Sequence, residues 1–470
     1  MRIYSGHLTT DDHKKALEKI VGPMHVVSDR DLLHTYAHDE TEDIFYLPDL
    51  VVKAGTTDEV SQILKYCNLH RIPVTPRGGG TGLTGGALAN LGGVVLSTER
   101  LNSIISIDEK NLQVITQPGV ITEVLQDAVK EKGLFFPPDP QSKGSCFIGG
   151  NIAENSGGPK AVKYGTVKDY VLNLEIVLPT GEIIWTGADV LKNATGYNLT
   201  QLIVGSEGTL GVVTTIVLKL IPLPRHSLLV MTPFDSAEKA CESITAIFMA
   251  GYTPSAVEFV DRDTIELALK FTETDGLNID RNAQAHLLIE VDGNNMDALM
   301  KDLEGIVAVV SAYNCGEILF AGDATQKEKL WRIRRSVGEA IKTESIYRDE
   351  DTVVPRAALP ELLCKIKEIG LKYGFKTVCC GHAGDGNMHI AVLRGSLTEE
   401  QWNGPVKEGI REIFRAVKKL GGTISAEHGI GLVQKEYLNE VFNADQIRLM
   451  KGIKQVFDPN NILNRGKIFD

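Results

Sequence analysis

The amino-acid sequence predicts an α+β protein made of two or three domains. The chain has 470 residues, which is too long for one hydrophobic core. Helical and strand-like segments alternate through its first half,. Two closely spaced prolines, Pro222 and Pro224, then end any regular element, and a different pattern of long helices and fewer strands follows,. We therefore expect domains at residues 1–222, 223–420 and 421–470.

The first predicted domain contains two helices and several short strands. Val60, Ile63, Leu64 and Cys67 have the spacing of one helix face, and Thr57 is the expected N-cap. A second helix is expected over about 122–132, ending at a glycine. Strands are expected at residues 94–96, 114–115, 172–178, 183–185 and 211–220.

The remainder predicts an α+β domain followed by a short helical C-terminal segment. Helices are expected at 236–250, 326–342, 359–373 and 444–457. Strands are expected at 287–291 and in a strand–loop–strand unit at 377–393.

Charge and hydropathy exclude several classes of function. Lys and Arg number 49 and Asp and Glu 61, a net charge of −12. An acidic chain without a basic tract is a poor partner for nucleic acid or an anionic membrane. No apolar run reaches the roughly 20 residues of a membrane helix, and residues 1–20 resemble neither a signal nor a transit peptide. We expect a cytoplasmic protein without a transmembrane segment.

The seven cysteines indicate a reducing compartment. Their number is odd and no two form a C-x-x-C pair. Iron–sulfur clusters, cysteine-type zinc sites and a disulfide framework are therefore not expected.

Glycine is unusually concentrated. Of 46 glycines, 22 lie between Gly78 and Gly211. Glycine is required where the backbone takes positive φ or comes very close to another group. The concentration predicts a long ligand lying against main chain, with a series of tight turns as the alternative.

Gly80, Gly82 and Gly85 match the dinucleotide pattern G-x-G-x-x-G. A Rossmann site needs a helix that opens directly from this loop, because the helix N-terminus holds the pyrophosphate. Here the loop continues through Gly92 and Gly93 into a strand, and each glycine would cost a helix about 1 kcal/mol relative to alanine. We reject the Rossmann interpretation and predict backbone N–H groups that bind an anion without a helix.

Three motifs follow one another in this region: residues 76–82, residues 137–158 and residues 205–211. Their order resembles the FAD-binding domain of the vanillyl-alcohol-oxidase (PCMH-type) flavoproteins, which is built from two α+β subdomains. The remainder resembles the FAD-linked oxidase C-terminal domain of D-lactate dehydrogenases, the glycolate oxidase FAD subunit and D-2-hydroxyglutarate dehydrogenase, an antiparallel-sheet α+β substrate (cap) domain. Covalent relatives have a histidine where this chain has Thr81, so the resemblance implies non-covalent FAD. The implied FAD-binding residues are Pro76, Arg77, Gly78, Gly79, Gly80, Thr81, Gly82, Gly85, Gly86, Pro138, Asp139, Ser142, Gly149, Gly150, Asn151, Asn155, Gly157, Gly158, Tyr164, Gly165, Glu207, Gly208 and Asn464.

A second group of residues has the composition of a metal site. His382, His389 and Glu427 provide two imidazoles and a carboxylate, a divalent-metal ligand set, although spacing alone leaves an ordinary histidine pair open. The resemblance implies that these three residues bind a divalent metal, with zinc first and manganese or iron as alternatives. It also implies that His428 is a base and Arg334 binds the substrate carboxylate.

Asn387 also resembles a substrate-contacting position. These residue types suit the oxidation of a 2-hydroxy acid. A metal lowers the pKa of the substrate hydroxyl, a histidine accepts its proton near neutrality, and the flavin accepts the hydride.

We therefore expect an FAD- and metal-dependent dehydrogenase of a D-2-hydroxy acid. Gly338 stands where the hydroxyglutarate enzymes have threonine, which disfavours a five-carbon diacid and leaves lactate, glycolate or a bulkier acid open. Arg465 stands where relatives have proline. The electron acceptor is external: a quinone, an electron-transfer flavoprotein, a cytochrome or a partner subunit. A homodimer and peripheral membrane attachment are left open.

Two alternatives are weighed against this expectation. The first is a redox-neutral enzyme of the alkyl-glycerone-phosphate-synthase type, and the second is an FAD-carrying electron-transfer subunit. Neither requires a metal at the histidine cluster.

Overall fold

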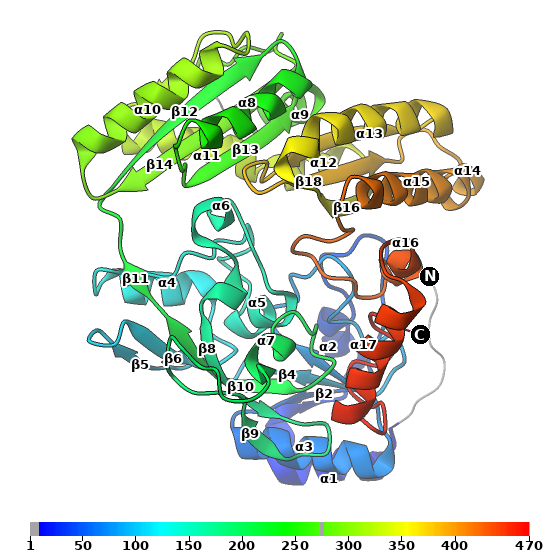
Figure 1. Ribbon diagram of the computed structural model, residues 1–470. Coiled ribbons are helices and arrows are strands. Elements are labelled where there is room, and N and C mark those ends of the chain that lie inside the picture. The colour runs from blue at the N-terminus through cyan, green and yellow to red at the C-terminus, as the bar shows by residue number, and fades with distance from the viewer. Residues whose placement is uncertain (1–8, 273–276, 470) are drawn as a thin grey trace. The chain divides into compact units, whose positions relative to one another are not determined.

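A computed structural model describes residues 9–272 and 277–469, and the chain folds into two compact units (Figure 1). Unit 1 contains the chain up to Ser156, Thr166–Leu223 and the residues from Glu427 onward. Unit 2 contains Gly157–Gly165 and Pro224–Ala426. Both units combine helices with sheets, which confirms the predicted α+β class. The division into functional domains at 222 and 420 stays a prediction.

Unit 1 contains two main sheets, as expected for two α+β subdomains. The first has the order β1-β2-β4-β3, with parallel pairing of β2 and β3 to β4. The second, β5-β6-β10-β8-β9, is antiparallel throughout, and β11 and β7 form a separate pair. The strands are β1 Val26–Val27, β2 Leu50–Lys53, β3 Val74–Arg77, β4 Val94–Ser97, β5 Ile104–Asp108, β6 Gln113–Thr116, β7 Leu134–Phe135, β8 Val171–Val177, β9 Ile183–Trp185, β10 Val212–Lys219 and β11 Ile221–Pro222.

The longest helices of unit 1 are α3 and α17, with 14 residues each. The α-helices are α1 Asp11–Val21, α2 Arg30–Leu33, α3 Thr57–His70, α4 Thr122–Lys130, α5 Ile148–Glu154, α7 Leu199–Ile203, α16 Leu438–Val441 and α17 Ala444–Phe457. Short 3₁₀ helices are η1 Pro23–His25, η2 His34–Tyr36, η3 Val167–Asp169 and η5 Lys435–Tyr437.

The C-terminal tail is part of the core of unit 1. Ile462 and Leu463 are buried with the apolar faces of α1, α3 and the first sheet. Val74 donates its N–H to the Ile462 carbonyl at 2.8 Å and accepts from the Asn464 N–H at 2.8 Å. The tail therefore runs beside β3, which brings Asn464 to the glycine-rich loop that follows this strand.

Unit 2 is built on a seven-stranded antiparallel sheet of order β15-β12-β14-β13-β17-β18-β16. The strands are β12 His226–Phe234, β13 Ala256–Asp261, β14 Ala285–Gly293, β15 Leu319–Ala321, β16 Tyr347–Val353, β17 Lys376–Gly381 and β18 Asn387–Leu393. The helices are α6 Ala161–Tyr164, α8 Ala237–Met249, α9 Arg262–Phe271, α10 Met296–Ser311, α11 Ala324–Arg335, α12 Val337–Glu344, η4 Arg356–Ala358, α13 Leu359–Tyr373, α14 Glu399–Asn403 and α15 Pro405–Lys419.

Both faces of this sheet are buried. Met231, Leu288 and Val260 belong to a core shared with α9, α11 and α12. Successive side chains in a strand point to opposite faces, and the intervening Phe259 and Ile289 are also fully buried. Because helices cover both faces, polar side chains at the sheet are unusual and invite a functional explanation.

The structure corrects two local expectations. Helix α3 is capped by Thr56, whose hydroxyl accepts from the Glu59 N–H at 3.1 Å, and not by Thr57. The single helix expected over 326–342 is two helices, α11 and α12, which meet at Ser336. The Ser336 hydroxyl donates to the Ile333 carbonyl at 2.9 Å, a local bond that competes with helix continuation.

Several other expectations are confirmed. The helix expected at 236–250 is α8, the helices α13 and α17 have the predicted bounds, and the strand–loop–strand unit is β17 and β18. Residues 78–93, all described, pass from β3 to β4 through turns without a helix. The rejection of a Rossmann site is therefore confirmed.

Candidate functional site

Two of the predicted metal-binding residues lie side by side in unit 2. His382 directly follows β17, and His389 lies on β18, where it pairs with Cys380 of β17. The two imidazole centroids are 5.4 Å apart and the rings are nearly perpendicular. Each ring offers a nitrogen within 4.8 Å of a nitrogen of the other. Gly386, with φ of +92°, permits the tight turn between the strands,.

A buried carboxylate that sequence reasoning missed joins His382 to Arg334. Glu258, on β13, is fully buried. Its Oε1 lies 2.7 Å from Nδ1 of His382, and its Oε2 lies 2.8 Å from Nε of Arg334 on α11. The Nε–Oε2 contact is an ion pair without the alignment of a hydrogen bond.

The surroundings of Glu258 keep it ionised. Burial acts to raise its pKa, but the nearby His382, Arg334 and His389 outweigh burial, so the pKa of Glu258 is lowered. A carboxylate at Nδ1 favours the tautomer that keeps the proton there, which leaves Nε2 of His382 as the metal-binding nitrogen. The donor chemistry around His382 therefore fits a metal ligand.

A second buried carboxylate, Asp351 on β16, holds Asn387. Oδ1 of Asp351 accepts from Nδ2 of Asn387 at 2.8 Å and lies 3.5 Å from Nδ1 of His389. Nδ2 of Asn387 also donates to the Thr352 carbonyl at 2.9 Å. The amide oxygen of Asn387 is buried and has no hydrogen-bond partner among the described residues. Asn387 is therefore oriented with an acceptor left for a ligand.

The sequence contains one indication of Asp351, which is that the segment forming β16 is rich in acidic residues. Asp349 and Asp351 alternate along β16 and so share one face of it,. Asp351 on β16 is the strand-pairing partner of His389 on the neighbouring strand β18. Asp349 offers an oxygen within 4.8 Å of a nitrogen of His389. Only the strand pairing reveals that these acids belong beside the histidines.

The chain passes from unit 2 to unit 1 between Ala426 and Glu427. Oδ2 of Asp351 accepts from the Ala426 N–H at 2.8 Å and from the Ser425 hydroxyl at 3.0 Å. The peptide that leads into Glu427 is therefore anchored in unit 2, whereas Glu427 and His428 belong to unit 1.

The glycine clusters of unit 1 converge on one another. A Cβ at Gly78 would lie 3.7 Å from the Gly150 amide nitrogen, and one at Gly79 would lie 2.5 Å from the Ser145 carbonyl oxygen. The loop after β3 thus packs directly on the segment that begins α5. A Cβ at Gly208 would lie 3.5 Å from Pro76, so the third cluster reaches the same loop.

Asn464, in the C-terminal tail, joins the first and third glycine clusters through two hydrogen bonds. Its Nδ2 donates to the Glu207 carbonyl at 2.7 Å and to the Gly86 carbonyl at 3.1 Å. Gly85 donates its N–H to the Thr41 hydroxyl at 2.7 Å. Residues far apart in the sequence therefore fix the loop that contains Thr81 and Gly82.

Arg77 supports the loop from inside the protein. Its Nη2 donates to the His38 carbonyl at 2.8 Å, and a Cβ at Gly80, which has φ of +71°, would lie 2.2 Å from that nitrogen. Glycine is required at position 80 by both conformation and packing. The guanidinium of Arg77 is committed to the protein.

Two glycines in this region have no such explanation. Cβ atoms at Gly82 and at Gly150 would meet nothing within 4 Å, and neither residue has positive φ. Their open surroundings fit a ligand that lies against main chain, and these residues suit a bound dinucleotide.

Several predicted FAD-binding side chains are occupied by other parts of unit 1. Asn151 donates to the Thr122 hydroxyl at 2.6 Å, and Oδ1 of Asn155 accepts from the Lys168 N–H at 2.9 Å. Asp139 pairs with Lys143 at 2.9 Å. The remaining contacts in this group involve main chain: the Pro138 carbonyl accepts from Gln126, the Ser142 carbonyl accepts from Ser145, and Gly149 donates to Pro118.

Gly157, Gly158, Tyr164 and Gly165 belong to unit 2. The Tyr164 hydroxyl donates to Oδ1 of Asp292 at 2.8 Å. Lys163 pairs with the same carboxylate at 2.6 Å, and Lys160 pairs with Glu290 at 2.6 Å. Residues 157–165 include four that were predicted to bind FAD together with residues of unit 1, but this segment belongs to unit 2 and contacts β14.

Unit 1 also contains buried charged groups that the sequence did not reveal. Burial, Glu207 and Asp39 raise the pKa of Glu154 well above its usual value, and burial raises the pKa of Asp39. Burial lowers the pKa of Lys467 to about 7, although Asp39 and Glu207 oppose this shift. One oxygen each of Glu154 and Asp39 lacks a hydrogen-bond partner among the described residues.

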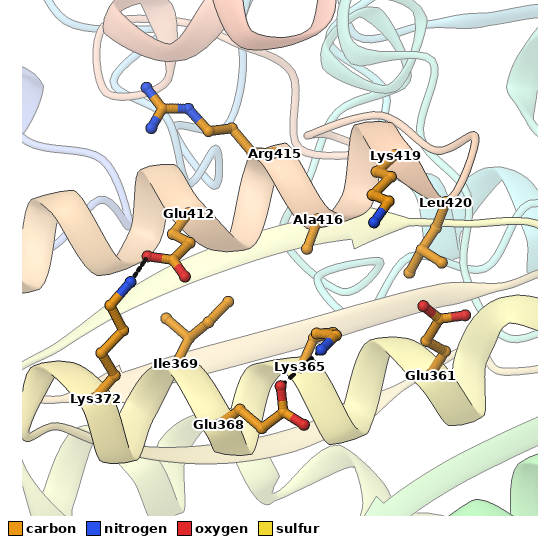
Figure 2. A pocket seen from close by; sticks show the side chains of 10 residues that line it. All are labelled: Glu361, Lys365, Glu368, Ile369, Lys372, Glu412, Arg415, Ala416, Lys419 and Leu420. Carbon is orange, nitrogen blue, oxygen red and sulfur yellow. Dashed lines mark hydrogen bonds and ion pairs between the residues drawn. The ribbon is translucent and has the colours of Figure 1, made fainter.

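A pocket of about 340 Å³ between α13 and α15 contains none of the predicted site residues (Figure 2). Lysine, arginine and glutamate side chains line it, and two ion pairs, Lys372–Glu412 at 2.6 Å and Lys365–Glu368 at 2.7 Å, involve lining residues. Its mixture of cationic and anionic side chains is that of a solvated groove between helices.

Comparison with known proteins defines the class of this protein. A family described as FAD linked oxidases, C-terminal domain, matches residues 223–468, and an FAD binding domain matches residues 48–187. The protein is thus a flavin-dependent oxidoreductase that binds FAD. More particularly, the chain belongs to the FAD-linked oxidase family.

The relatives match along nearly the whole chain. The glycolate oxidase subunit GlcD of Bacillus subtilis is 38% identical over 98% of this chain and 97% of its own. A D-lactate dehydrogenase of Anaerostipes hadrus is 37% identical over 96% of each chain. A D-2-hydroxyglutarate dehydrogenase of Stutzerimonas stutzeri is 32% identical over 96% of this chain and 98% of its own.

Solved structures confirm the predicted PCMH-type fold. p-Cresol methylhydroxylase has a TM-score of 0.81 at 18% identity, covering 98% of this chain and 97% of its own. An alkyldihydroxyacetonephosphate synthase has a TM-score of 0.76 at 17% identity, covering 98% and 86%. No helix within residues 9–272 or 277–469 is long and apolar enough to cross a bilayer.

Proposed function

We propose that this protein is an FAD- and divalent-metal-dependent dehydrogenase that oxidises a D-2-hydroxy acid to the 2-oxo acid. The named activities of its relatives, on glycolate, D-lactate and D-2-hydroxyglutarate, support a hydroxy-acid substrate. The open surroundings of Gly82 and Gly150 support a bound FAD.

One observation carries the proposal. The fully buried Glu258 contacts both His382, a residue of the metal-binding type, and Arg334, a residue of the carboxylate-binding type. A buried charge is costly unless it is paired. This arrangement orients a metal ligand and a substrate-binding cation together, as a chelating hydroxy acid requires.

The donor set of His382, His389 and Glu427 suits zinc first, with manganese or iron as alternatives. When bound, the metal would lower the pKa of the substrate hydroxyl, and FAD would supply the hydride acceptor. His428 removes the hydroxyl proton, since imidazole titrates near neutrality.

The remaining residues bind and orient the substrate. The guanidinium of Arg334 binds its carboxylate. The buried amide oxygen of Asn387, whose amide group is held by Asp351, accepts a hydrogen bond from the substrate hydroxyl. Gly338 disfavours a five-carbon diacid and leaves lactate, glycolate or a bulkier acid as the substrate. An external acceptor reoxidises the flavin.

Anaerobic bleaching of the bound flavin tests this function. Purified protein loaded with zinc is mixed with paired D- and L-lactate and D- and L-2-hydroxyglutarate, and with glycolate, before and after a chelator. We expect D-lactate or glycolate to bleach the flavin, and chelation to abolish bleaching until zinc is restored. His389→Ala should remove the response, whereas His226→Ala, on β12 of the same sheet, should not.

The same experiment separates the alternatives. A redox-neutral enzyme would show no net bleaching and no metal dependence, and an electron-transfer subunit would bleach only with its partner. Failure of every hydroxy acid to bleach the metal-loaded protein contradicts the proposal.

A further inference from the structure

We propose that Glu207 is a positioning residue that holds the turn carrying His428, and that its carboxylate does not bind the flavin. The inference rests on the proposed role of His428 as the base. It assigns a mechanical function to a residue that the sequence placed among the FAD ligands.

Both oxygens of Glu207 are engaged by one short segment. Oε1 accepts from the Ile430 N–H at 2.8 Å, and Oε2 accepts from the Gly431 N–H at 2.7 Å. Glu207 is 5% exposed. Burial raises the pKa of Glu207, and the hydrogen bonds from Ile430 and Gly431 oppose that shift. The carboxyl group of Glu207 therefore holds two consecutive amides, which lie two and three residues after His428.

Thr84 holds the same turn through two further bonds. Its hydroxyl donates to the His428 carbonyl at 3.2 Å, and its carbonyl accepts from the Leu432 N–H at 2.7 Å. Four hydrogen bonds thus fix the main chain from 428 to 432. Both residues that make these bonds, Glu207 and Thr84, belong to unit 1.

Gly429 allows the carboxylate to come this close. It has φ of +80°, and a Cβ there would lie 3.0 Å from Oε1 of Glu207 and 2.3 Å from Oε2 of Glu154. A side chain at position 429 would push the turn away from both carboxylates. Gly429 and Glu207 therefore form one close contact.

Glu207 itself is anchored to the glycine-rich region. Its N–H donates to the Ala153 carbonyl at 2.8 Å, and its carbonyl accepts from Asn464 at 2.7 Å. Glu207 thus connects α5 and the C-terminal tail to the turn of His428. A general base must lie within hydrogen-bond reach of the proton it removes, so this connection bears directly on the rate of the chemical step.

Glu207→Gln in the FAD-loaded protein tests the inference. One oxygen becomes an NH₂ group, which cannot accept from Ile430 or Gly431. We expect amide exchange in a peptide covering 428–432 to accelerate at least tenfold. FAD content should be unchanged, and kcat should fall at least tenfold with KM within twofold. Glu59→Gln is the matched control, since Glu59 accepts from the Gly55 N–H at 2.7 Å elsewhere in unit 1.

A second pair of variants keeps the test decisive if Glu207→Gln does not fold. Thr84→Val removes the bond to the His428 carbonyl and should lower kcat, whereas Thr84→Ser retains the hydroxyl and should restore it. Loss of FAD with unchanged exchange at 428–432 would identify Glu207 as a flavin ligand and overturn the proposal. Faster exchange with unchanged kcat would overturn it as well. Bleaching of the wild-type flavin tests the proposed function separately, because the exchange measurement requires no turnover.

Discussion

Oε1 of Glu258 lies 2.7 Å from Nδ1 of His382, although the two residues are 124 positions apart in the sequence. The same carboxylate forms a buried ion pair with Arg334. A single acidic group inside the sheet of unit 2 thus orients an imidazole and a guanidinium. Metal binding and the stability of unit 2 should therefore depend strongly on Glu258.

Glu258→Gln should weaken both metal binding and folding. The variant removes the charge that orients His382, and loss of such a partner weakens metal affinity about 10–100-fold. It also breaks the buried ion pair with Arg334, which costs about 3–5 kcal/mol. Zinc titration and urea unfolding measure the two effects.

Glu328→Gln is the control for this variant. Glu328 pairs with Arg335 on the same helix, α11, but both side chains are exposed. Exposed pairs contribute at most about 1 kcal/mol, so stability and zinc affinity should change little. Equal effects of the two substitutions would contradict the assigned role of Glu258.

Asp351→Asn should lower the activity of the folded protein. The variant replaces an acceptor oxygen with a donor, which disturbs either Asn387 or the Ala426 N–H. We expect kcat/KM for the hydroxy acid to fall at least tenfold, or about 1.4 kcal/mol. Steady-state kinetics on protein of known FAD and zinc content measures the loss.

Asp261→Asn provides a matched buried carboxylate in the same sheet. Asp261 accepts from the Thr264 and Cys379 N–H groups at 2.9 and 2.8 Å. Its replacement should lower the free energy of unfolding while leaving kcat/KM per folded molecule unchanged. A similar loss of activity in both variants would show that Asp351 acts through stability alone.

Gly82→Ala should weaken FAD binding without destabilising the apoprotein. A Cβ at this position meets no protein atom within 4 Å, so it would occupy space that the ligand uses. We expect the Kd for FAD, measured by flavin fluorescence, to rise at least tenfold. The melting temperature without FAD should stay within about 1 °C.

Substitutions at two other glycines serve as controls for Gly82→Ala. Gly79→Ala should lower the stability of the apoprotein, because its Cβ would lie 2.5 Å from the Ser145 carbonyl oxygen. Gly452→Ala, in the middle of α17 and in open space, should stabilise by about 0.5–1 kcal/mol and leave FAD affinity unchanged. Unchanged FAD affinity in Gly82→Ala would place the ligand elsewhere.

Stability should rise with pH above neutrality because of Lys467. Burial lowers its pKa to about 7 in the folded protein, whereas the unfolded value is about 10.4. Between these values the unfolded chain binds one more proton, so the free energy of unfolding increases with pH. From pH 7 to 8.5 the expected gain is about 1.5 kcal/mol.

Lys467→Met isolates this contribution. The variant carries no titrating amine, so its stability should rise less than that of the wild type over the same interval, as measured by urea unfolding. It also removes the bonds to the Leu88 and Asn464 oxygens at 2.7 and 2.8 Å, which lowers stability at both pH values. Parallel pH profiles would show that Lys467 has an ordinary pKa.

Local sequence patterns predicted many elements because they depend on neighbours. The helices expected at 236–250, 359–373 and 444–457 are present as α8, α13 and α17. The break at Ser336 was missed, because the apolar periodicity continues across it from α11 into α12.

The sequence by itself predicted a long ligand against glycine-rich main chain, with tight turns as the alternative, and a histidine pair with a carboxylate, Glu427, 38 residues after His389. Composition and residue spacing are sufficient for these predictions, because the glycine-rich and histidine motifs are short stretches of sequence. Only the tertiary structure decided which buried acids support those motifs. Glu258, Asp351 and Glu207 reach their partners across 36 to 224 positions. Hydrogen bonds over such separations are set by strand pairing and packing, which no local pattern records.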